Sequence, residues 1–341
     1  MDRIRESDVR KEKVLYLQTG KVEVSVVYNL STKEQICMKK IFVDSIQEAT
    51  LIQSEFIAMA YFDHPNILSL KGASLEGNAK EITHVLIYMD YFPEGDLEKF
   101  IQHAINSKTY LSEETILEYL KQLVSGYCYM EKKNIAHRDI KPQNIFLTGN
   151  GKTLKIGDLG SAIKKEGNSG ATLTGTPLYL SPILRKAYTF QSLSGMNIKH
   201  NIFKSDVYSL GLTFLYLASL RSVNDLANLE NLEGKINKRV ADLPEQYTIL
   251  KKILFSMLEV NEQERPNFTE LNAMLGKFNR IETLTIESII STGVNLMLAP
   301  SKCSICNLEN SEDQLYLFKT KMICVKCYES FMRKRGKVSK L

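Results

Sequence analysis

The sequence predicts an α+β fold of two lobes, a small β-rich lobe followed by a larger helical lobe, with a small four-cysteine zinc module at the C-terminus. Three observations support this. Apolar and polar residues alternate with period two near the N-terminus, helical spacing dominates after Pro93, and two Cys-x-x-Cys pairs lie near the end. The 341 residues also exceed the length of about 250–300 at which a single core stops growing.

The small lobe is predicted over residues 14–92, behind a solvated charged arm at residues 1–13. Val22, Val24 and Val26 alternate with polar residues, which indicates a half-buried strand. A helix is predicted between later strands because apolar residues in Ser45–Phe62 recur at helical spacing. The other strand-like runs are Gln35–Phe42 and Val85–Phe92.

The large lobe is predicted over residues 93–278, with the boundary near Tyr91–Gly95. Ser112 is a plausible start for one of its helices, because a serine there can accept a hydrogen bond from a backbone N–H of the first turn. Residues 279–300 form a connector, and residues 301–341 form the zinc module with a basic tail. The predicted helices are Asp96–Asn106, Ser112–Lys132, Lys204–Leu220 and Tyr247–Leu258.

Composition is that of a globular protein, with 44% hydrophobic and 24% charged residues. The net charge of +5 is small for this length and gives no argument for a nucleic-acid or membrane partner. The charged N-terminus has no apolar signal region, and the longest apolar run, Leu210–Leu220, is too short to span a bilayer. We therefore expect a cytoplasmic or nuclear protein with no membrane partner.

The catalytic candidates are Asp139, Lys141, Asn144 and Asp158. Phosphoryl transfer requires positioned charge: ligands for the metal ions on the phosphates, a cation near the transferred group, and a side chain that orients the attacking hydroxyl. Two carboxylates, one amide and one ammonium supply these groups. Short strands are predicted on either side of a turn at Gly149–Gly151, and the four residues surround this hairpin.

The segments His137-Arg138-Asp139-Ile140-Lys141-Pro142-Gln143-Asn144 and Asp158-Leu159-Gly160 closely resemble the catalytic loop and metal-binding segment of eukaryotic protein kinases. The resemblance covers roughly residues 14–278 and implies the bilobal protein-kinase fold, with ATP and Mg²⁺ as cofactors and protein substrates as partners. It implies that Asp139 accepts the hydroxyl proton and that Lys141 neutralises the γ-phosphate. Asn144 and Asp158 would hold Mg²⁺.

The resemblance also assigns an ATP-binding set in the small lobe. Lys39 matches the strand lysine that holds the α- and β-phosphates, and Glu55 matches its helix partner. Asp90, Tyr91 and Phe92 match the hinge, whose backbone would bond the adenine. Plain core packing would explain each apolar position equally well. The apolar residues placed around the adenine are Val24, Cys37, Met89 and Phe146.

Thr174-Gly175-Thr176-Pro177 and the residues that follow resemble the end of an activation segment. Thr176 would contact Lys141 and Asp139, a mark of the serine/threonine branch of the family. Arg138 could pair with a phosphate on the activation loop, for which the candidate acceptors are Ser169, Thr172 and Thr174.

Two departures from the family pattern are apparent. Where the family has three phosphate-binding glycines, only Gly20 is present, which predicts weaker nucleotide binding. Ile183 stands where the family places a glutamate that pairs with the arginine matching Arg265. Because a buried unpaired arginine is costly, Arg265 is expected to find another acid or water.

Cys303, Cys306, Cys324 and Cys327 form two Cys-x-x-Cys pairs separated by seventeen residues. This spacing predicts a structural zinc site with four thiolates, and the expected knuckle, hairpin and helix resemble a treble-clef finger. The spacing also resembles that of DNA-binding GATA-type fingers, but the rest of that pattern is missing. We expect a protein partner for this module rather than nucleic acid.

The leading hypothesis is an active protein serine/threonine kinase. A pseudokinase-like scaffold with weak nucleotide binding is the first alternative, because of the poor glycine loop and Ile183. An adaptor that acts through its zinc finger is the second.

Overall fold

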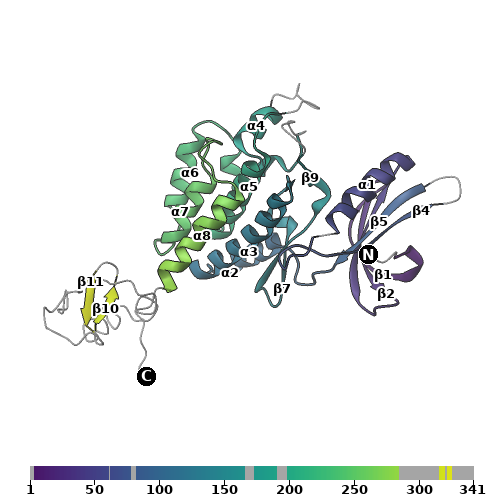
Figure 1. Ribbon diagram of the computed structural model, residues 1–341, viewed down its shortest axis with the longest axis horizontal. Coiled ribbons are helices and arrows are strands. Elements are labelled where there is room, and N and C mark those ends of the chain that lie inside the picture. The colour runs from purple at the N-terminus through teal and green to yellow at the C-terminus, as the bar shows by residue number, and fades with distance from the viewer. Residues whose placement is uncertain are drawn as a thin grey trace. The chain divides into compact units, whose positions relative to one another are not determined.

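The computed structural model describes residues 4–60, 62–77, 82–165, 173–189, 198–283, 315–318 and 321–324. The chain divides into two compact units, Met1–Asn279 and Arg280–Leu341. The first unit contains both predicted lobes, and Figure 1 shows its sheet, with one helix beside it, apart from the remaining helices.

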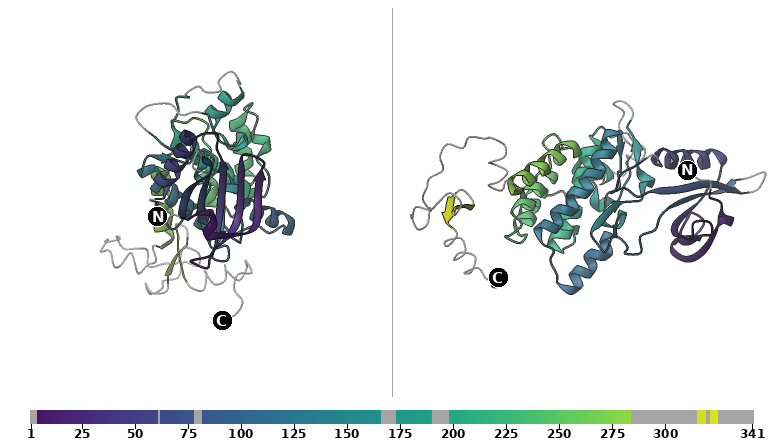
Figure 2. Two further views of the ribbon diagram at one scale, coloured as in Figure 1. Left: turned by 90° about the vertical axis from the view of Figure 1, so that its right-hand side faces the viewer. Right: turned by 60° about the horizontal axis from the view of Figure 1, so that its bottom comes forward.

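The N-terminal lobe is built on one antiparallel sheet with strand order β1-β2-β3-β5-β4. Helix α1 (Ile46–Met59) packs beside β4 and β5 (Figure 1), and the right-hand view of Figure 2 shows it along one side of the sheet. The strands are β1 (Val9–Gln18), β2 (Val22–Asn29), β3 (Gln35–Phe42), β4 (Leu70–Gly77) and β5 (Ile82–Asp90).

The two faces of this sheet carry different side chains because successive residues of a strand point to opposite faces. Val24 lies opposite Lys39, and Cys37 lies opposite Met89, so these four residues share the face that α1 covers. The other face carries a separate apolar cluster, which consists of Ile4, Val27, Ile36, Met38, Leu86 and Tyr88.

The first residues of the chain are part of the lobe, which differs from the expected charged arm. A 3-10 turn, η1 (Glu6–Asp8), precedes β1, and β1 pairs with β2 from Val9 onward. The side chains from Arg10 to Gln18 are exposed, as their charge suggested, but the backbone is the edge strand of the sheet. Charge alone gave no signal for this strand because its main-chain hydrogen bonds do not depend on side-chain polarity.

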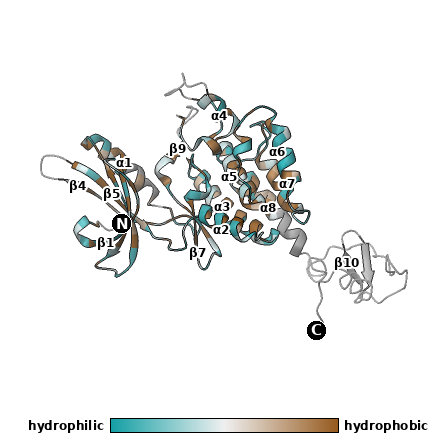
Figure 3. Cartoon of the chain, turned by 180° about the vertical axis from the view of Figure 1, so that it is seen from behind, coloured by the Kyte–Doolittle hydropathy of each residue, from teal (hydrophilic) through white to brown (hydrophobic). Residues whose placement is uncertain are grey.

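The C-terminal lobe is helical and contains the larger core. Helix α5 runs through that core, with sixteen buried residues. The surrounding helices have one apolar side, and Figure 3 shows both teal and brown on α6 and α7. The helices are α2 (Leu97–Ser107), α3 (Glu113–Lys132), α4 (Pro182–Thr189), α5 (Ile202–Ser219), α6 (Leu232–Ala241), α7 (Thr248–Met257) and α8 (Phe268–Thr283).

The helix predicted to begin at Ser112 does so, since the Ser112 hydroxyl accepts a hydrogen bond from the backbone N–H of Thr115 at 3.2 Å. Asp96 caps α2 in the same way through the backbone N–H of Lys99. Such caps satisfy N–H groups that have no partner within the helix.

Four short strands position the candidate site. The predicted hairpin is present as β7 (Ile145–Thr148) and β8 (Thr153–Ile156), with positive φ angles at Gly149, Asn150 and Gly151 in its turn. The segment after the hairpin pairs back onto the catalytic loop through β6 (Ile135–Ala136) and β9 (Ile163–Lys164). These pairings bring the two motif segments together.

Beyond the last residues of α8, the described part of the second unit is an antiparallel hairpin of β10 (Leu315–Phe318) and β11 (Lys321–Cys324). A hairpin was predicted between the two cysteine pairs. The side chains of this unit lie outside the described residues, as do Cys303, Cys306 and Cys327 altogether. None of the helices in the described ranges is long and apolar enough to cross a membrane.

Candidate active site

The backbone of the proposed catalytic loop is hydrogen-bonded to the side chain of Asp206 in α5. Its carboxylate accepts hydrogen bonds from the backbone N–H groups of His137 at 2.7 Å and Arg138 at 2.9 Å. Arg138 itself has a φ angle of 67°, a left-handed conformation that is uncommon for a residue with a side chain. Asp206 is buried, and burial raises its pKa to about 7. The hydrogen bonds from the two amides and the charge of Arg138 lower this pKa, but by less than burial raises it.

His137 links this loop to the segment that carries Asp158. The imidazole is fully buried, and its Nε2 lies 2.9 Å from the carbonyl oxygen of Gly157. Burial lowers the pKa of His137, which favours a neutral ring that donates to this carbonyl. Arg138 makes a second link, because its Nε donates to the carbonyl of Ser161 at 2.7 Å.

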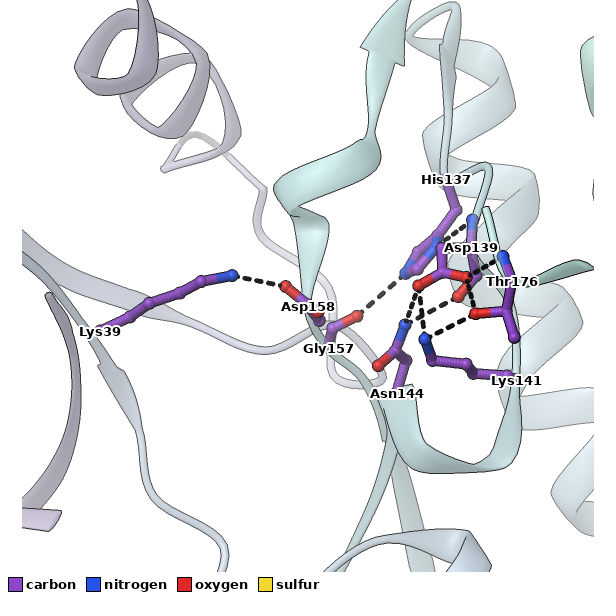
Figure 4. A network of polar contacts seen from close by, with 8 residues as sticks. All are labelled: Lys39, His137, Asp139, Lys141, Asn144, Gly157, Asp158 and Thr176. Carbon is purple, nitrogen blue, oxygen red and sulfur yellow. Dashed lines mark hydrogen bonds and ion pairs between the residues drawn. The ribbon is translucent and has the colours of Figure 1, made fainter. Parts of the chain in front are cut away.

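Asp139 is the centre of a hydrogen-bond network (Figure 4). Its Oδ2 accepts from Lys141 Nζ at 2.8 Å and from Asn144 Nδ2 at 3.0 Å. Its Oδ1 accepts from the backbone N–H of Thr176 at 2.9 Å and from the Thr176 hydroxyl at 2.7 Å. The network fixes the carboxylate from both sides.

The electrostatic balance keeps Asp139 ionised. Burial would raise its pKa, but the hydrogen bonds from Lys141 and Thr176 and the charge of Lys141 outweigh it, so the pKa lies below its usual value. A carboxylate with a lowered pKa is a poor general base at neutral pH. The geometry therefore suits orientation of a neighbouring donor.

Lys141 bridges the catalytic loop and the segment after residue 173. Its Nζ also donates to the Thr176 hydroxyl at 2.8 Å, so one ammonium contacts both Asp139 and Thr176. The Asn144 amide donates to both the carbonyl and the carboxylate of Asp139, at 2.8 and 3.0 Å. With both N–H bonds directed there, its Oδ1 is turned away from Asp139 (Figure 4).

Asp158 lies at a left-handed turn, with a φ angle of 46°, and faces the N-terminal lobe. Its Oδ1 accepts from Lys39 Nζ at 2.9 Å, the contact drawn across the two lobes in Figure 4. Burial would raise the pKa of Asp158, but the Lys39 ammonium holds it below its usual value. The sequence paired Lys39 with Glu55; Glu55 is within α1, but its side chain lies outside the described residues.

The chain matches the family model described as "Protein kinase domain" over residues 18–275. It is also similar to curated serine/threonine-protein kinases. It is 32% identical over 243 residues to "Serine/threonine-protein kinase Nek8" of Danio rerio, covering 70% of this chain and 32% of that protein. It is 32% identical over 263 residues to "Probable serine/threonine-protein kinase nek2" of Dictyostelium discoideum, covering 74% and 59%.

The chain belongs to the protein kinase family. The aligned part spans about one third of the zebrafish relative and less than two thirds of the Dictyostelium one. A third relative, "Serine/threonine-protein kinase Nek5" of Mus musculus, is 30% identical over 253 residues, covering 73% of this chain and 37% of that protein.

The residues expected around the adenine in this kinase come from both lobes. Val24, Cys37 and Met89 share a sheet face with Lys39. Phe146 of β7 stacks on Phe92, with ring centroids 5.4 Å apart. Gly157 lies against this pair, because a Cβ added there would be 2.4 Å from the Phe146 ring.

The expected hinge begins at the end of β5. The Asp90 carboxylate is fixed by Lys71 Nζ at 2.8 Å and by the backbone N–H of Ser69 at 3.0 Å, so the side chain is engaged with β4 and the residue before it. Nothing in the sequence indicates the ion pair between Lys71 and Asp90, because the two residues are nineteen positions apart.

Among the activation-segment candidates, Thr174 and Thr176 are described, whereas Ser169 and Thr172 lie outside the described residues. Thr174 is half-buried and lines a small cavity of about 20 Å³ together with Arg138 and His200. Thr176 is the residue that the structure joins directly to Asp139.

Proposed function

We propose that this chain transfers the γ-phosphate of Mg-ATP to serine and threonine hydroxyls of protein substrates. The observation that carries the proposal is the Asp139 carboxylate, which is held ionised and oriented by Lys141, Asn144 and Thr176. The relatives whose names state serine/threonine kinase activity support the same class of acceptor.

Asp139 would accept a hydrogen bond from the substrate hydroxyl and align its oxygen for attack. Because its pKa is lowered, full proton transfer is expected only late in the reaction, when the hydroxyl has become acidic. Lys141, already 2.8 Å from both Asp139 and Thr176, would balance the negative charge of the transferred group.

Asn144 and Asp158 would hold Mg²⁺, which neutralises charge that develops on the phosphates. Mg²⁺ prefers oxygen ligands, and both residues provide one. Asn144 Oδ1 and Asp158 Oδ2 have no hydrogen-bond partner within the described part of the chain, whereas their other side-chain polar atoms are engaged. Lys39 would bind the α- and β-phosphates, with Glu55 as its proposed helix partner.

The adenine would lie between the apolar residues of the two lobes, Val24 and Cys37 on one side and Phe146 on the other, with Met89 behind it. The stacked Phe92 and Phe146 rings and the shared sheet face support this position. The backbone of residues 90–92 would bond the adenine edge. Burial raises the pKa of the Cys37 thiol to about 11, so the thiol beside the adenine would be uncharged at neutral pH.

One observation favours the alternative of a scaffold with weak nucleotide binding. The turn between β1 and β2 is short, and the backbone N–H of Lys21 is used within it, donating to the carbonyl of Gln18 at 2.9 Å. That amide is then not available to a phosphate. Val22, which carries a Cβ where the family has glycine, adds bulk next to this turn.

Incorporation of labelled phosphate into a generic protein substrate tests the enzyme. The wild type should label the substrate in a Mg²⁺-dependent manner, and Asp139→Asn should lower the rate by about 10²- to 10⁴-fold. Asp242→Asn, an exposed aspartate after α6, is the matched control and should retain the wild-type rate. Equal labelling by wild type and Asp139→Asn, or none by either, would favour the scaffold.

We further propose that Cys303, Cys306, Cys324 and Cys327 bind a structural zinc ion that serves a protein-binding module. The antiparallel pairing of β10 with β11, which ends at Cys324, supports this because a hairpin was expected between the two cysteine pairs. Atomic spectroscopy should find one zinc per chain, and none in a Cys303→Ser, Cys306→Ser variant. Equal zinc content in both would exclude the site.

A further inference from the structure

Ile183 raises a structural question, because the family anchors its activation segment through a glutamate at this position. The arginine that would pair with it, Arg265, has 1% exposure. Its guanidinium donates to the backbone carbonyls of Glu259 at 2.8 Å and Lys204 at 3.0 Å, with a longer contact to Val260 at 3.3 Å. It also lies over the Tyr208 ring at 4.8 Å.

Arg265 is therefore satisfied without an acid. The expected replacement carboxylate is therefore corrected: backbone carbonyls and the aromatic ring take its place among the described residues. None of the described partners of Arg265 belongs to the segment before α4, so Arg265 does not hold that segment here.

A different buried arginine contacts that segment. Arg185, two residues after Ile183 in α4, has 5% exposure. One terminal nitrogen donates to the carbonyls of Leu178 at 2.9 Å and Leu180 at 3.0 Å. The other donates to the carbonyl of Leu226, in the 3-10 turn η6 (Asn224–Leu226) that follows α5.

The carbonyl between these two is held by α5. The Ser209 hydroxyl donates to the carbonyl of Tyr179 at 2.7 Å, so three successive carbonyls are bound by side chains of the C-terminal lobe. The Ser181 and Ser205 hydroxyls, 3.0 Å apart, make the next contact along the chain. Residues 178–181 are thereby fixed at every position.

We propose that Arg185 is a positioning residue that replaces the family's glutamate–arginine pair as the anchor of the activation segment. Thr176, which bonds Asp139, is only two residues before Leu178, so the guanidinium of Arg185 sets the position of the residues that meet the protein substrate. The planar guanidinium of Arg185 bonds carbonyls of residues 178–180 and of η6 at the same time, and a lysine ammonium does not reproduce this geometry.

The kinetic part of this inference rests on the proposed kinase function, whereas the anchoring does not. Hydrogen exchange of the full chain therefore tests the anchor without any activity. In Arg185→Met, the amides of Thr176 and of residues 178–181 should exchange about 10- to 100-fold faster than in the wild type, the effect of losing hydrogen bonds from a charged donor.

Arg265→Met is the matched control, because it removes an equally buried arginine that also bonds carbonyls. It should change exchange near residues 259–265 and leave residues 176–181 within about twofold of the wild type. Faster exchange of 176–181 in Arg265→Met but not in Arg185→Met would overturn the proposal. If either methionine variant fails to fold, the lysine variants at the same positions give the same comparison with smaller effects.

Steady-state kinetics then test the consequence for catalysis. Arg185→Met should raise the KM for the protein substrate by about 10-fold or more and leave the KM for ATP within about twofold, since ATP contacts other residues. Arg265→Met should not raise the KM for the protein substrate relative to the KM for ATP. An inactive wild type would refute the kinase proposal but leave the exchange result standing; equal changes in both KM values would refute the positioning role.

Discussion

Thr176 makes two hydrogen bonds to one oxygen of Asp139, from its backbone N–H at 2.9 Å and from its hydroxyl at 2.7 Å. The same hydroxyl accepts from Lys141 Nζ at 2.8 Å. The activation segment and the catalytic loop thus share a single polar centre, and the position of one depends on the position of the other.

Replacement of the Thr176 hydroxyl should weaken phosphotransfer. Thr176→Val keeps the shape and the backbone N–H but removes the hydroxyl, and hydrogen bonds to charged groups contribute about 1.5–3 kcal/mol. The kcat for a protein substrate should therefore fall by about 10- to 100-fold. Thr176→Ser retains the hydroxyl and should stay within a few-fold of the wild type; a valine variant of full activity would contradict this role.

Lys39 should make folding stability depend on pH through Asp158. In the wild type, the lowered pKa of Asp158 adds stability above its unfolded pKa of about 3.9, and this stability is lost as the pH falls through the folded pKa. In Lys39→Met the ammonium is absent, and only the smaller effects of His137 and Lys141 still oppose the effect of burial on the pKa of Asp158.

The difference in stability between wild type and Lys39→Met should thus be constant above pH about 5 and shrink toward pH 3. Urea unfolding at low ionic strength over this range measures it, because salt screens an exposed pair. Lys252→Met, an exposed lysine on α7, is expected to show no such trend. A difference that is the same at every pH would mean that Lys39 does not hold Asp158.

Asp206→Asn should destabilise the fold. The carboxylate accepts from two backbone N–H groups, one on each oxygen. In asparagine the NH2 group, itself a donor, replaces one of these oxygens and leaves a buried N–H without an acceptor. Such a group costs about 1–3 kcal/mol. Urea unfolding at pH 8, where the wild-type carboxylate is ionised, should show this loss at an unchanged m-value, and Asp242→Asn should stay within about 0.5 kcal/mol of the wild type.

Gly175→Ala should disturb the same region by a steric route. Gly175 has a φ angle of 106°, and an added Cβ would lie 2.5 Å from the carbonyl oxygen of Arg138. The backbone must shift, and Thr176, the next residue, would move away from Asp139. We expect a loss of phosphotransfer of at least about 10-fold, whereas Gly276→Ala on α8, with no atom within 4 Å of the added Cβ, should retain the wild-type rate.

Removal of the proposed zinc ion should affect the C-terminal unit and not the kinase unit. A strong chelator, or the Cys303→Ser, Cys306→Ser variant, should lower the thermal stability of the C-terminal unit because a structural zinc contributes directly to folding. Phosphotransfer should remain unchanged, since the residues proposed to be catalytic all lie in the first unit, before residue 280. A parallel loss of activity on chelation, with Mg²⁺ restored in excess, would show that the units are coupled.

The contacts within the proposed catalytic loop were predictable because they depend on the types of its side chains. Asp139, Lys141, Asn144 and Asp158 have few alternative roles when they occur in that order, and the β7–β8 hairpin between them has a clear turn signal. The structure brings Asp139, Lys141 and Asn144 into direct contact and places Asp158 against Lys39.

Contacts to the backbone could not be predicted in this way. Arg185 and Arg265 are both stabilised by carbonyl oxygens, and every residue has one, so the sequence does not indicate which carbonyl a guanidinium will meet. For the same reason no strand was predicted where β1 lies, because its pairing with β2 uses main-chain groups and its exposed side chains follow no apolar alternation.

The position of Ile4 has a practical consequence for handling this protein. Its side chain fills the apolar cluster on the outer face of the sheet, and Glu6 contacts Lys40 Nζ at 3.0 Å. The family match begins at residue 18, the last residue of β1. A fragment cloned from that boundary would lack the edge strand and leave Val27, Met38 and Leu86 open to water. Expression should therefore include the chain from residue 1, with any fusion partner placed at the C-terminus.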